Sequence, residues 1–192
     1  MSQGKLRTAV IVPVNAAAVI DDWRERTCEA KPSNGVPAHI TLVFPFVPPT
    51  EIDDCITGTL RGLIARESSF TFAFRETCRF PHTLYLAPDP AEPFVRLTEA
   101  IGQRYPQYPP YGGAFPSIVP HLTVAQGGDE LLDEAEAMVR LLLPIAAAAT
   151  EALLLEETVA DWGGWEVRAR LPLSGSERSA PRRDPVVAKP VD

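Results

Sequence analysis

Apolar residues along the chain follow two spacings, one typical of strands and one typical of helices. Apolar runs or strict alternation with polar residues predict strands at residues 7–14, 38–44 and 119–125. Apolar residues three or four positions apart predict helices at residues 16–29, after Thr50, after Pro93, and at 129–143. Strands and helices therefore alternate along most of the chain.

Two further pairs of strand patterns are separated by short turns and predict β-hairpins. One pairs residues 69–79 with 83–87, and the other pairs residues 150–160 with 164–172. Adjacent antiparallel strands favour an α+β fold over a doubly wound parallel sheet. Thr50, with Asp53 three residues later, has the pattern of a helix N-cap. The apolar run from Leu141 to Ala149 is interpreted as the end of the last helix.

The composition is that of a globular protein, except at the C-terminal end, where it changes. Of the 192 residues, 45% are hydrophobic and 22% are charged, so most of the chain can bury a core. From Ser174 onward Ser, Pro, Arg and Lys dominate, which predicts a disordered tail over residues 174–192. The remaining residues, 1–173, are expected to form one domain.

The first twenty residues have some features of a secretory signal. Lys5 and Arg7 precede an apolar run that contains three consecutive alanines, but Pro13 and Asn15 interrupt it. A strand followed by a helix accounts for the same pattern. No segment has the ~18 consecutive apolar residues that span a bilayer, so we expect no contact with a membrane.

Charge and cysteine content restrict the partners and the compartment. The net charge of −7 argues against a protein that coats long nucleic acids, which is normally basic. The three cysteines are scattered and form no CxxC or CxxH pair, which argues against a structural zinc site. An odd, sparse set of cysteines suits the reducing cytoplasm, where we expect the protein to be.

A repeated tetrad is the most informative feature of the sequence. His39-Ile40-Thr41-Leu42 and His121-Leu122-Thr123-Val124 share the order His, aliphatic, Thr, aliphatic, and a proline stands just upstream of each. Side chains two positions apart on a strand point to the same face, so each His shares a face with its Thr. If the two strands meet across a cleft, two imidazoles and two hydroxyls converge.

Two imidazoles suffice for cleavage of a phosphodiester. One neutral histidine accepts a proton from the attacking water or hydroxyl, and one protonated histidine donates a proton to the leaving oxygen. Threonine hydroxyls can donate hydrogen bonds to the phosphate oxygens. Threonine is a poor zinc ligand and neither tetrad contains Asp or Glu, so no metal or other cofactor is expected.

The paired tetrads resemble the signature of the 2H phosphoesterase superfamily, within it the 2′-5′ RNA ligase-like and cyclic phosphodiesterase-like proteins. The resemblance extends over about residues 6–172. It implies a bilobal, pseudo-twofold α+β fold in which two antiparallel sheets, with helices outside, enclose a central cleft. It also implies metal-independent action on 2′,3′-cyclic phosphates or 2′,5′ linkages of RNA ends or small nucleotides. By position, His39 and His121 are catalytic, and Thr41 and Thr123 bind phosphate.

Three aromatic residues near the tetrads are candidate substrate contacts: Phe46, Tyr111 and Phe115. Packing in the core or at the rim is the alternative for Phe46. Gln126 is interpreted as a polar residue at a strand end, and Trp162 and Trp165 as packing residues of a hairpin.

The acidic composition, without a basic stripe near either tetrad, favours a short RNA end, a cyclic nucleotide or another small phosphodiester over a tRNA-like substrate. A nucleotide-binding or RNA-end-binding module without catalysis is the alternative function. In a third interpretation the tetrads are coincidental, and their histidines lie apart. The sequence indicates no protein partner.

Overall fold

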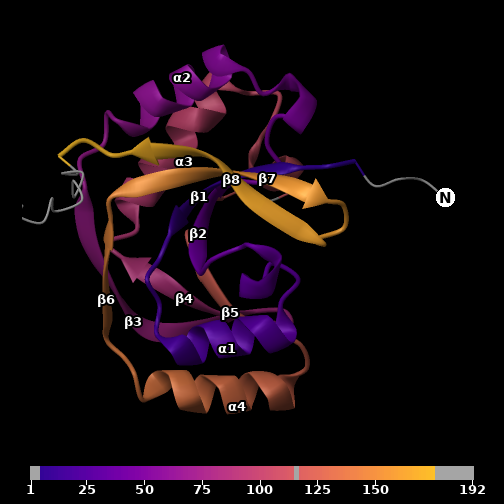
Figure 1. Ribbon diagram of the computed structural model, residues 1–192. Coiled ribbons are helices and arrows are strands. Elements are labelled where there is room, and N and C mark those ends of the chain that lie inside the picture. The colour runs from indigo at the N-terminus through magenta and orange to yellow at the C-terminus, as the bar shows by residue number, and fades with distance from the viewer. Residues whose placement is uncertain (1–4, 115–116, 176–192) are drawn as a thin grey trace, which may run out of the picture.

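The computed structural model describes residues 5–114 and 117–175, which form an α+β fold with two four-stranded antiparallel sheets (Figure 1). The strands are β1 (Thr8–Pro13), β2 (His39–Val43), β3 (Phe70–Phe80), β4 (Thr83–Asp89), β5 (Leu122–Gln126), β6 (Ile145–Ala149), β7 (Glu151–Val159) and β8 (Gly164–Pro172). The α-helices are α1 (Ala18–Thr27), α2 (Asp54–Ile64), α3 (Glu92–Arg104) and α4 (Asp129–Arg140). Short 3₁₀ helices are η1 (Pro32–Asn34), η2 (Pro49–Glu51) and η3 (Pro110–Gly113).

The two sheets have matching layouts. The first has the order β2-β1-β7-β8, and the second has the order β5-β4-β3-β6. In each sheet the edge strand at the start of this order belongs to one of the two tetrads. Strand β2 pairs with β1, and β5 pairs with β4. The units β1-α1-β2 and β4-α3-β5 are therefore equivalent, which gives the fold its pseudo-twofold symmetry.

The helices between these strands are exchanged between the halves. Helix α1 leaves the first sheet and packs against β5 of the second, whereas α3 leaves the second sheet and packs against β2 of the first. Helix α4 covers β3, β4 and β5, while α2 packs against β8. Figure 1 shows the result, with α1 and α4 together on one side and α2 and α3 on the opposite side.

Strand β1 is buried on both faces, which explains its nearly continuous apolar sequence. Val10 and Val12 belong to the main core, which extends through both halves. Ala9 and Ile11 point to the opposite face and belong to a smaller cluster with Trp165. The smaller cluster lies on the side of the first sheet that faces the cavity described below.

Two local predictions from the sequence are wrong. Thr50 is not a helix N-cap but lies within η2, and the cap of α2 is Asp53, whose side chain accepts a hydrogen bond of 2.8 Å from the Ile56 amide. The last helix ends at Arg140, not at residue 143, and the alanine run forms strand β6. In that strand the small alanines lie opposite phenylalanines of β3, with Ala147 paired to Phe72.

Both predicted hairpins, β3–β4 and β7–β8, are present. Of the predicted C-terminal tail, Ser174 is hydrogen-bonded through its backbone to Glu67 and Ser69, and residues 176–192 lie outside the described residues. Within the described ranges, no helix is long and apolar enough to cross a membrane.

Candidate active site

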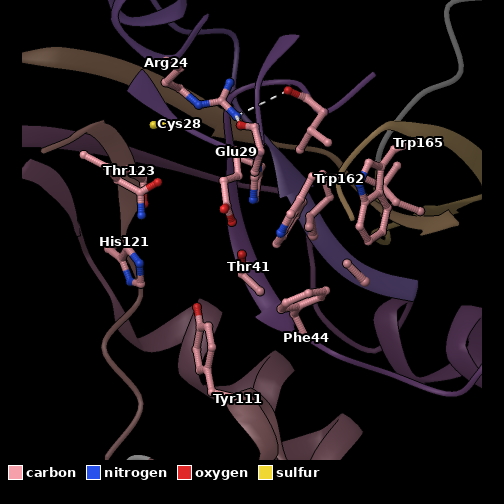
Figure 2. Close-up of a pocket in the computed structure, with 17 residues that line it drawn as sticks. Arg24, Cys28, Glu29, Thr41, Phe44, Tyr111, His121, Thr123, Trp162 and Trp165 are labelled. Carbon is pink, nitrogen blue, oxygen red and sulfur yellow. Dashed lines mark hydrogen bonds between the residues drawn. The ribbon is translucent and has the colours of Figure 1, made fainter. Parts of the chain in front are cut away.

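The two tetrad strands meet at a cavity of about 270 Å³ between the sheets (Figure 2). Strands β2 and β5 contact each other across the pseudo-twofold axis. The cavity is lined by Ala9, Ile11, Arg24, Cys28, Glu29, Ala30, Val36, His39, Thr41, Phe44, Tyr111, His121, Thr123, Gln126, Leu155, Trp162 and Trp165. Both histidines and both threonines of the tetrads are therefore brought to one site.

Alternation along the strands explains this arrangement. On β2, Ile40 and Leu42 are fully buried in the core, whereas His39 and Thr41 are half-buried and face the cavity. Leu122 and Val124 occupy the equivalent core positions of the second tetrad, and His121 and Thr123 face the cavity. The aliphatic residues thus hold each strand against the core, and this fixes the direction of the polar residues.

Each histidine makes the same hydrogen bond to its own chain. Nδ1 of His39 lies 2.7 Å from the Pro37 carbonyl oxygen, and Nδ1 of His121 lies 2.7 Å from the Val119 carbonyl oxygen. A carbonyl can only accept, so Nδ1 carries the proton in both rings. In the neutral imidazole, Nε2 then holds the lone pair that can accept a proton.

The two rings differ in what surrounds them. Burial, helped by the nearby positive charge of Arg24, lowers the pKa of His39 from 6.5 to about 4. Burial also lowers the pKa of His121. The His121 ring lies edge-to-face against Phe80 and Tyr85, at centroid distances of 5.2 and 5.5 Å.

Arg24 brings a buried positive charge to the wall of the cavity. Only 2% of it is exposed, and its Nη2 donates to the carbonyl oxygens of Ala30 and Val36 at 2.6 and 3.3 Å. Its nearest carboxylate is that of Asp21, at 3.4 Å from Nη1. These bonds anchor the loop that leads to Pro37 and His39.

Three aromatic rings, Phe44, Trp162 and Trp165, form one wall of the cavity, called here the aromatic wall. Their ring centroids are 5.2 to 6.2 Å apart. The Arg7 guanidinium lies 4.5 Å from the centroid of the Trp162 ring. Figure 2 shows Trp162 facing the open space from the side opposite His121.

The backbone of Trp162 is held in an uncommon conformation. Its φ of 65° lies in the left-handed region, which is unfavourable for a large residue. Its amide donates to the buried carboxylate of Glu157, and its carbonyl accepts from the Asn34 side chain. Glu157 is in turn paired with Arg7 at 2.7 Å. Strain that is held in this way is typical of functional sites.

Tyr111 reaches the cavity from η3. Its backbone amide donates to the Phe44 carbonyl at 2.7 Å, which ties η3 to the end of the first tetrad strand. Burial raises the pKa of Tyr111, and a hydrogen bond with the Thr41 side chain acts in the opposite direction. Figure 2 shows its hydroxyl pointing toward the space between His121 and Thr41.

The structure places the other aromatic candidates elsewhere. Phe46 is 3% exposed and packs against Tyr105 and Tyr108 in the core, so the expectation that it contacts substrate does not fit its position. The proline-rich turn at residues 45–49 carries Phe46 away from the cavity. Phe115 lies outside the described residues.

Several residues that line the cavity were not expected from the sequence. Trp162 and Trp165, interpreted as hairpin packing, belong to the aromatic wall, and Gln126 also borders the cavity. Arg24 was not singled out, although it lies four residues after Ile20 on the buried face of α1. A charged residue on an apolar helix face is the signal that would have identified it.

Comparisons with known proteins give one family match and several solved structures with the same fold. Residues 12–161 match the sequence profile of the 2′-5′ RNA ligase superfamily. No curated protein sequence matches the chain.

Solved structures with the same fold include LigT of Escherichia coli in its apo form, with a TM-score of 0.55 and 17% identity over 88% of this chain and 98% of that chain. LigT complexed with 3′-AMP gives a TM-score of 0.54 and 17% identity over 89% of this chain and 99% of that chain. A protein of Thermus thermophilus gives a TM-score of 0.55 and 20% identity over 89% of this chain and all of its own.

Proposed function

Because the chain belongs to the 2′-5′ RNA ligase superfamily, within the 2H phosphoesterases, we propose that it cleaves 2′,3′-cyclic phosphates or 2′,5′-phosphodiester bonds of RNA ends or small nucleotides. In this proposal the reaction needs no metal. His39 and His121 are the catalytic acid and base. Thr41, Thr123 and Tyr111 bind the substrate.

One observation carries the proposal: both histidines border one cavity, and the same backbone bond fixes Nδ1–H in both rings. Each neutral ring therefore has the Nε2 lone pair available for proton transfer. One Nε2 takes a proton from the attacking oxygen while the other, protonated, gives one to the leaving oxygen. The phosphorus lies between them.

The threonines supply neutral donors to the phosphate. Thr41 and Thr123 share a face with the two histidines and border the same cavity. Their hydroxyls would donate to the non-bridging oxygens, where negative charge increases in the transition state. Arg24 adds positive charge to the cavity wall, although the whole chain carries −7.

The aromatic wall is an argument for a substrate that carries a planar ring, such as a nucleobase. Stacking of a base on an aromatic side chain contributes roughly 1–3 kcal/mol. Trp162 is the ring that faces the open space.

A substrate screen tests the proposal. Wild type and the double variant His39→Ala/His121→Ala are assayed with the 2′,3′-cyclic mononucleotides and with short 2′,5′-linked oligonucleotides, with and without EDTA. We expect wild-type turnover that EDTA leaves unchanged and that the double variant lacks. Binding of these nucleotides without turnover would instead favour a binding module, and activity that EDTA abolishes and zinc restores would reveal a metal site.

A further inference from the structure

The equivalent helices α1 and α3 differ by one buried charge. The buried faces of α1 and α3 repeat the same spacing, with Ile20, Trp23 and Arg24 in α1 and Phe94, Leu97 and Thr98 in α3. A neutral threonine therefore occupies the position in α3 at which α1 has a guanidinium. The pseudo-twofold symmetry of the backbone does not extend to the electrostatics of the site.

The positive charge of Arg24 is only weakly compensated. Its closest partners, the carbonyl oxygens of Ala30 and Val36, are neutral. Asp21 lies 3.4 Å away, and its side chain is 42% exposed, so water screens its charge. Arginine stays protonated even when buried. Arg24 binds the Val36 carbonyl, and the next residue, Pro37, accepts the hydrogen bond from the His39 ring, so this cation lies on the His39 side of the cavity.

The other titratable groups around His39 do not cancel this cation. Burial raises the pKa of the Cys28 thiol and of the Tyr111 hydroxyl, so both stay neutral near pH 7. His121 also faces the cavity and adds no negative charge. Glu29 is a carboxylate that lines the cavity, and its charge acts on Arg7, whose pKa is raised mainly by Glu157 and in smaller part by Glu29. The charges that act on the pKa of His39 are those of Arg24 and His121.

We propose that Arg24 is a positioning residue that makes the two histidines unequal, so that His39 is the general base and His121 the general acid in hydrolysis of a 2′,3′-cyclic phosphate. This proposal rests on the proposed function. A cation beside His39 disfavours its protonation, which is what a base requires. The negative charge of the phosphate favours protonation of His121, which lies farther from the Arg24 cation.

The proton balance of the step is simple. Nε2 of His39 removes a proton from water, and the water oxygen forms a bond to phosphorus. The bond from phosphorus to one ring oxygen breaks, and that oxygen takes the proton from Nε2 of His121. The product is a phosphomonoester, and exchange of protons with solvent restores both rings.

The first test measures the histidine pKa values directly. NMR titration of the imidazole resonances is compared in wild type, Arg24→Gln, Arg24→Lys and Asp21→Asn. We expect the pKa of His39 to rise by about one unit in Arg24→Gln and to fall by a few tenths in Asp21→Asn, while Arg24→Lys keeps it nearly unchanged. The pKa of His121 should move much less in all three variants.

The second test links these values to the reaction. The pH profile of kcat/KM for 2′,3′-cyclic AMP is recorded for the same four proteins. If His39 is the base, the acidic limb follows its pKa from variant to variant and the alkaline limb stays in place. An alkaline limb that follows His39 would reverse the assignment and overturn the proposal.

The controls separate the possible failures. If Arg24→Gln does not fold, Asp21→Asn still tests the charge, because it keeps Arg24 and removes the carboxylate that partly compensates it. An unchanged pKa of His39 in Arg24→Gln, or in Asp21→Asn if Arg24→Gln does not fold, would overturn the role of Arg24. Absence of turnover on every cyclic and 2′,5′-linked substrate would refute the proposed function alone, since the NMR result stands independently.

Discussion

His39 and His121 have equivalent backbone positions and different neighbours. Each ring is fixed by a 2.7 Å bond from Nδ1 to a carbonyl two residues upstream. The first, however, lies near the buried Arg24 and on the half that carries the aromatic wall, whereas the second lies edge-to-face against Phe80 and Tyr85.

The comparison separates two tasks of the fold. The repeated β-α-β unit places the two rings symmetrically, which is what a phosphate between them requires. The side chains around the rings are not repeated, and they give each ring its own chemical environment. The symmetry of the backbone therefore sets the positions of the two imidazole rings, and the side chains that break this symmetry set the proton affinity of each ring.

The strongest test of this comparison removes each imidazole in turn. His39→Ala and His121→Ala should each lower kcat by roughly 10²–10⁴, because one acid–base group contributes about that much. Steady-state assays with a 2′,3′-cyclic nucleotide measure the loss, and the circular dichroism spectrum verifies the fold. His82, on a turn outside the cavity, offers the control variant His82→Ala. Full activity in either tetrad variant would show that the two rings do not work as a pair.

The threonines test whether the phosphate is held evenly from both halves. Thr41→Val and Thr123→Val keep a β-branched side chain and remove the hydroxyl. A hydrogen bond to a charged group contributes about 1.5–3 kcal/mol, so each variant should lose roughly 10- to 100-fold in kcat/KM. Equal losses fit a phosphate on the pseudo-twofold axis. A change below twofold in both variants would exclude the hydroxyls from phosphate binding.

The aromatic wall belongs to the first half, and the proposed function predicts that it stacks on the base of the substrate. Trp162→Ala should raise the KM for 2′,3′-cyclic AMP by about 5- to 100-fold, because the substitution removes stacking of the Trp162 ring on the base. Ribose 2′,3′-cyclic phosphate, which has no base, serves as the control substrate and should be processed equally by both proteins. A similar loss on both substrates would mean that Trp162 only maintains the shape of the cavity.

The smallest expected effect concerns the helices that follow the two tetrad strands. Helix α2 has a side-chain cap at Asp53, whereas the N-cap residue of α4 is Gly128, which has no side chain to supply one. Asp53→Ala should lower the free energy of unfolding by about 1 kcal/mol, and Gly128→Ser should raise it by a few tenths. Urea denaturation measures both, and Thr50→Ala should be nearly neutral. A larger loss in Thr50→Ala than in Asp53→Ala would contradict the observed cap.

Much of the fold and the centre of the site follow from local sequence patterns. The alternation in the tetrads placed Ile40 and Leu122 in the core and both histidines on one surface, as the structure has them. The turn residues of the two hairpins likewise predicted the antiparallel pairing. In these segments the local preference and the global fold agree.

The rest depends on contacts between distant residues. Strand β6 consists largely of alanine, which has no strand preference of its own and forms a strand because it lies opposite the phenylalanines of β3. The position of Trp162 in the cavity depends on Asn34 and Glu157, which no local pattern connects to it. Phe46 lies four residues after the first tetrad, but a bend of the chain directs it inward.

The exchange of α1 and α3 between the halves has a consequence for how the molecule folds and moves. Helices α1 and α3 reach the sheets they pack against only when residues far apart in the chain have met, as Thr27 and Gln126 do across a separation of 99. Such long-range contacts slow folding and make it cooperative, so we expect that neither half folds alone. The spacing of the two imidazoles is consequently a property of the interlocked interior, so under the proposed function a phosphodiester must fit a distance that the protein fixes before it binds.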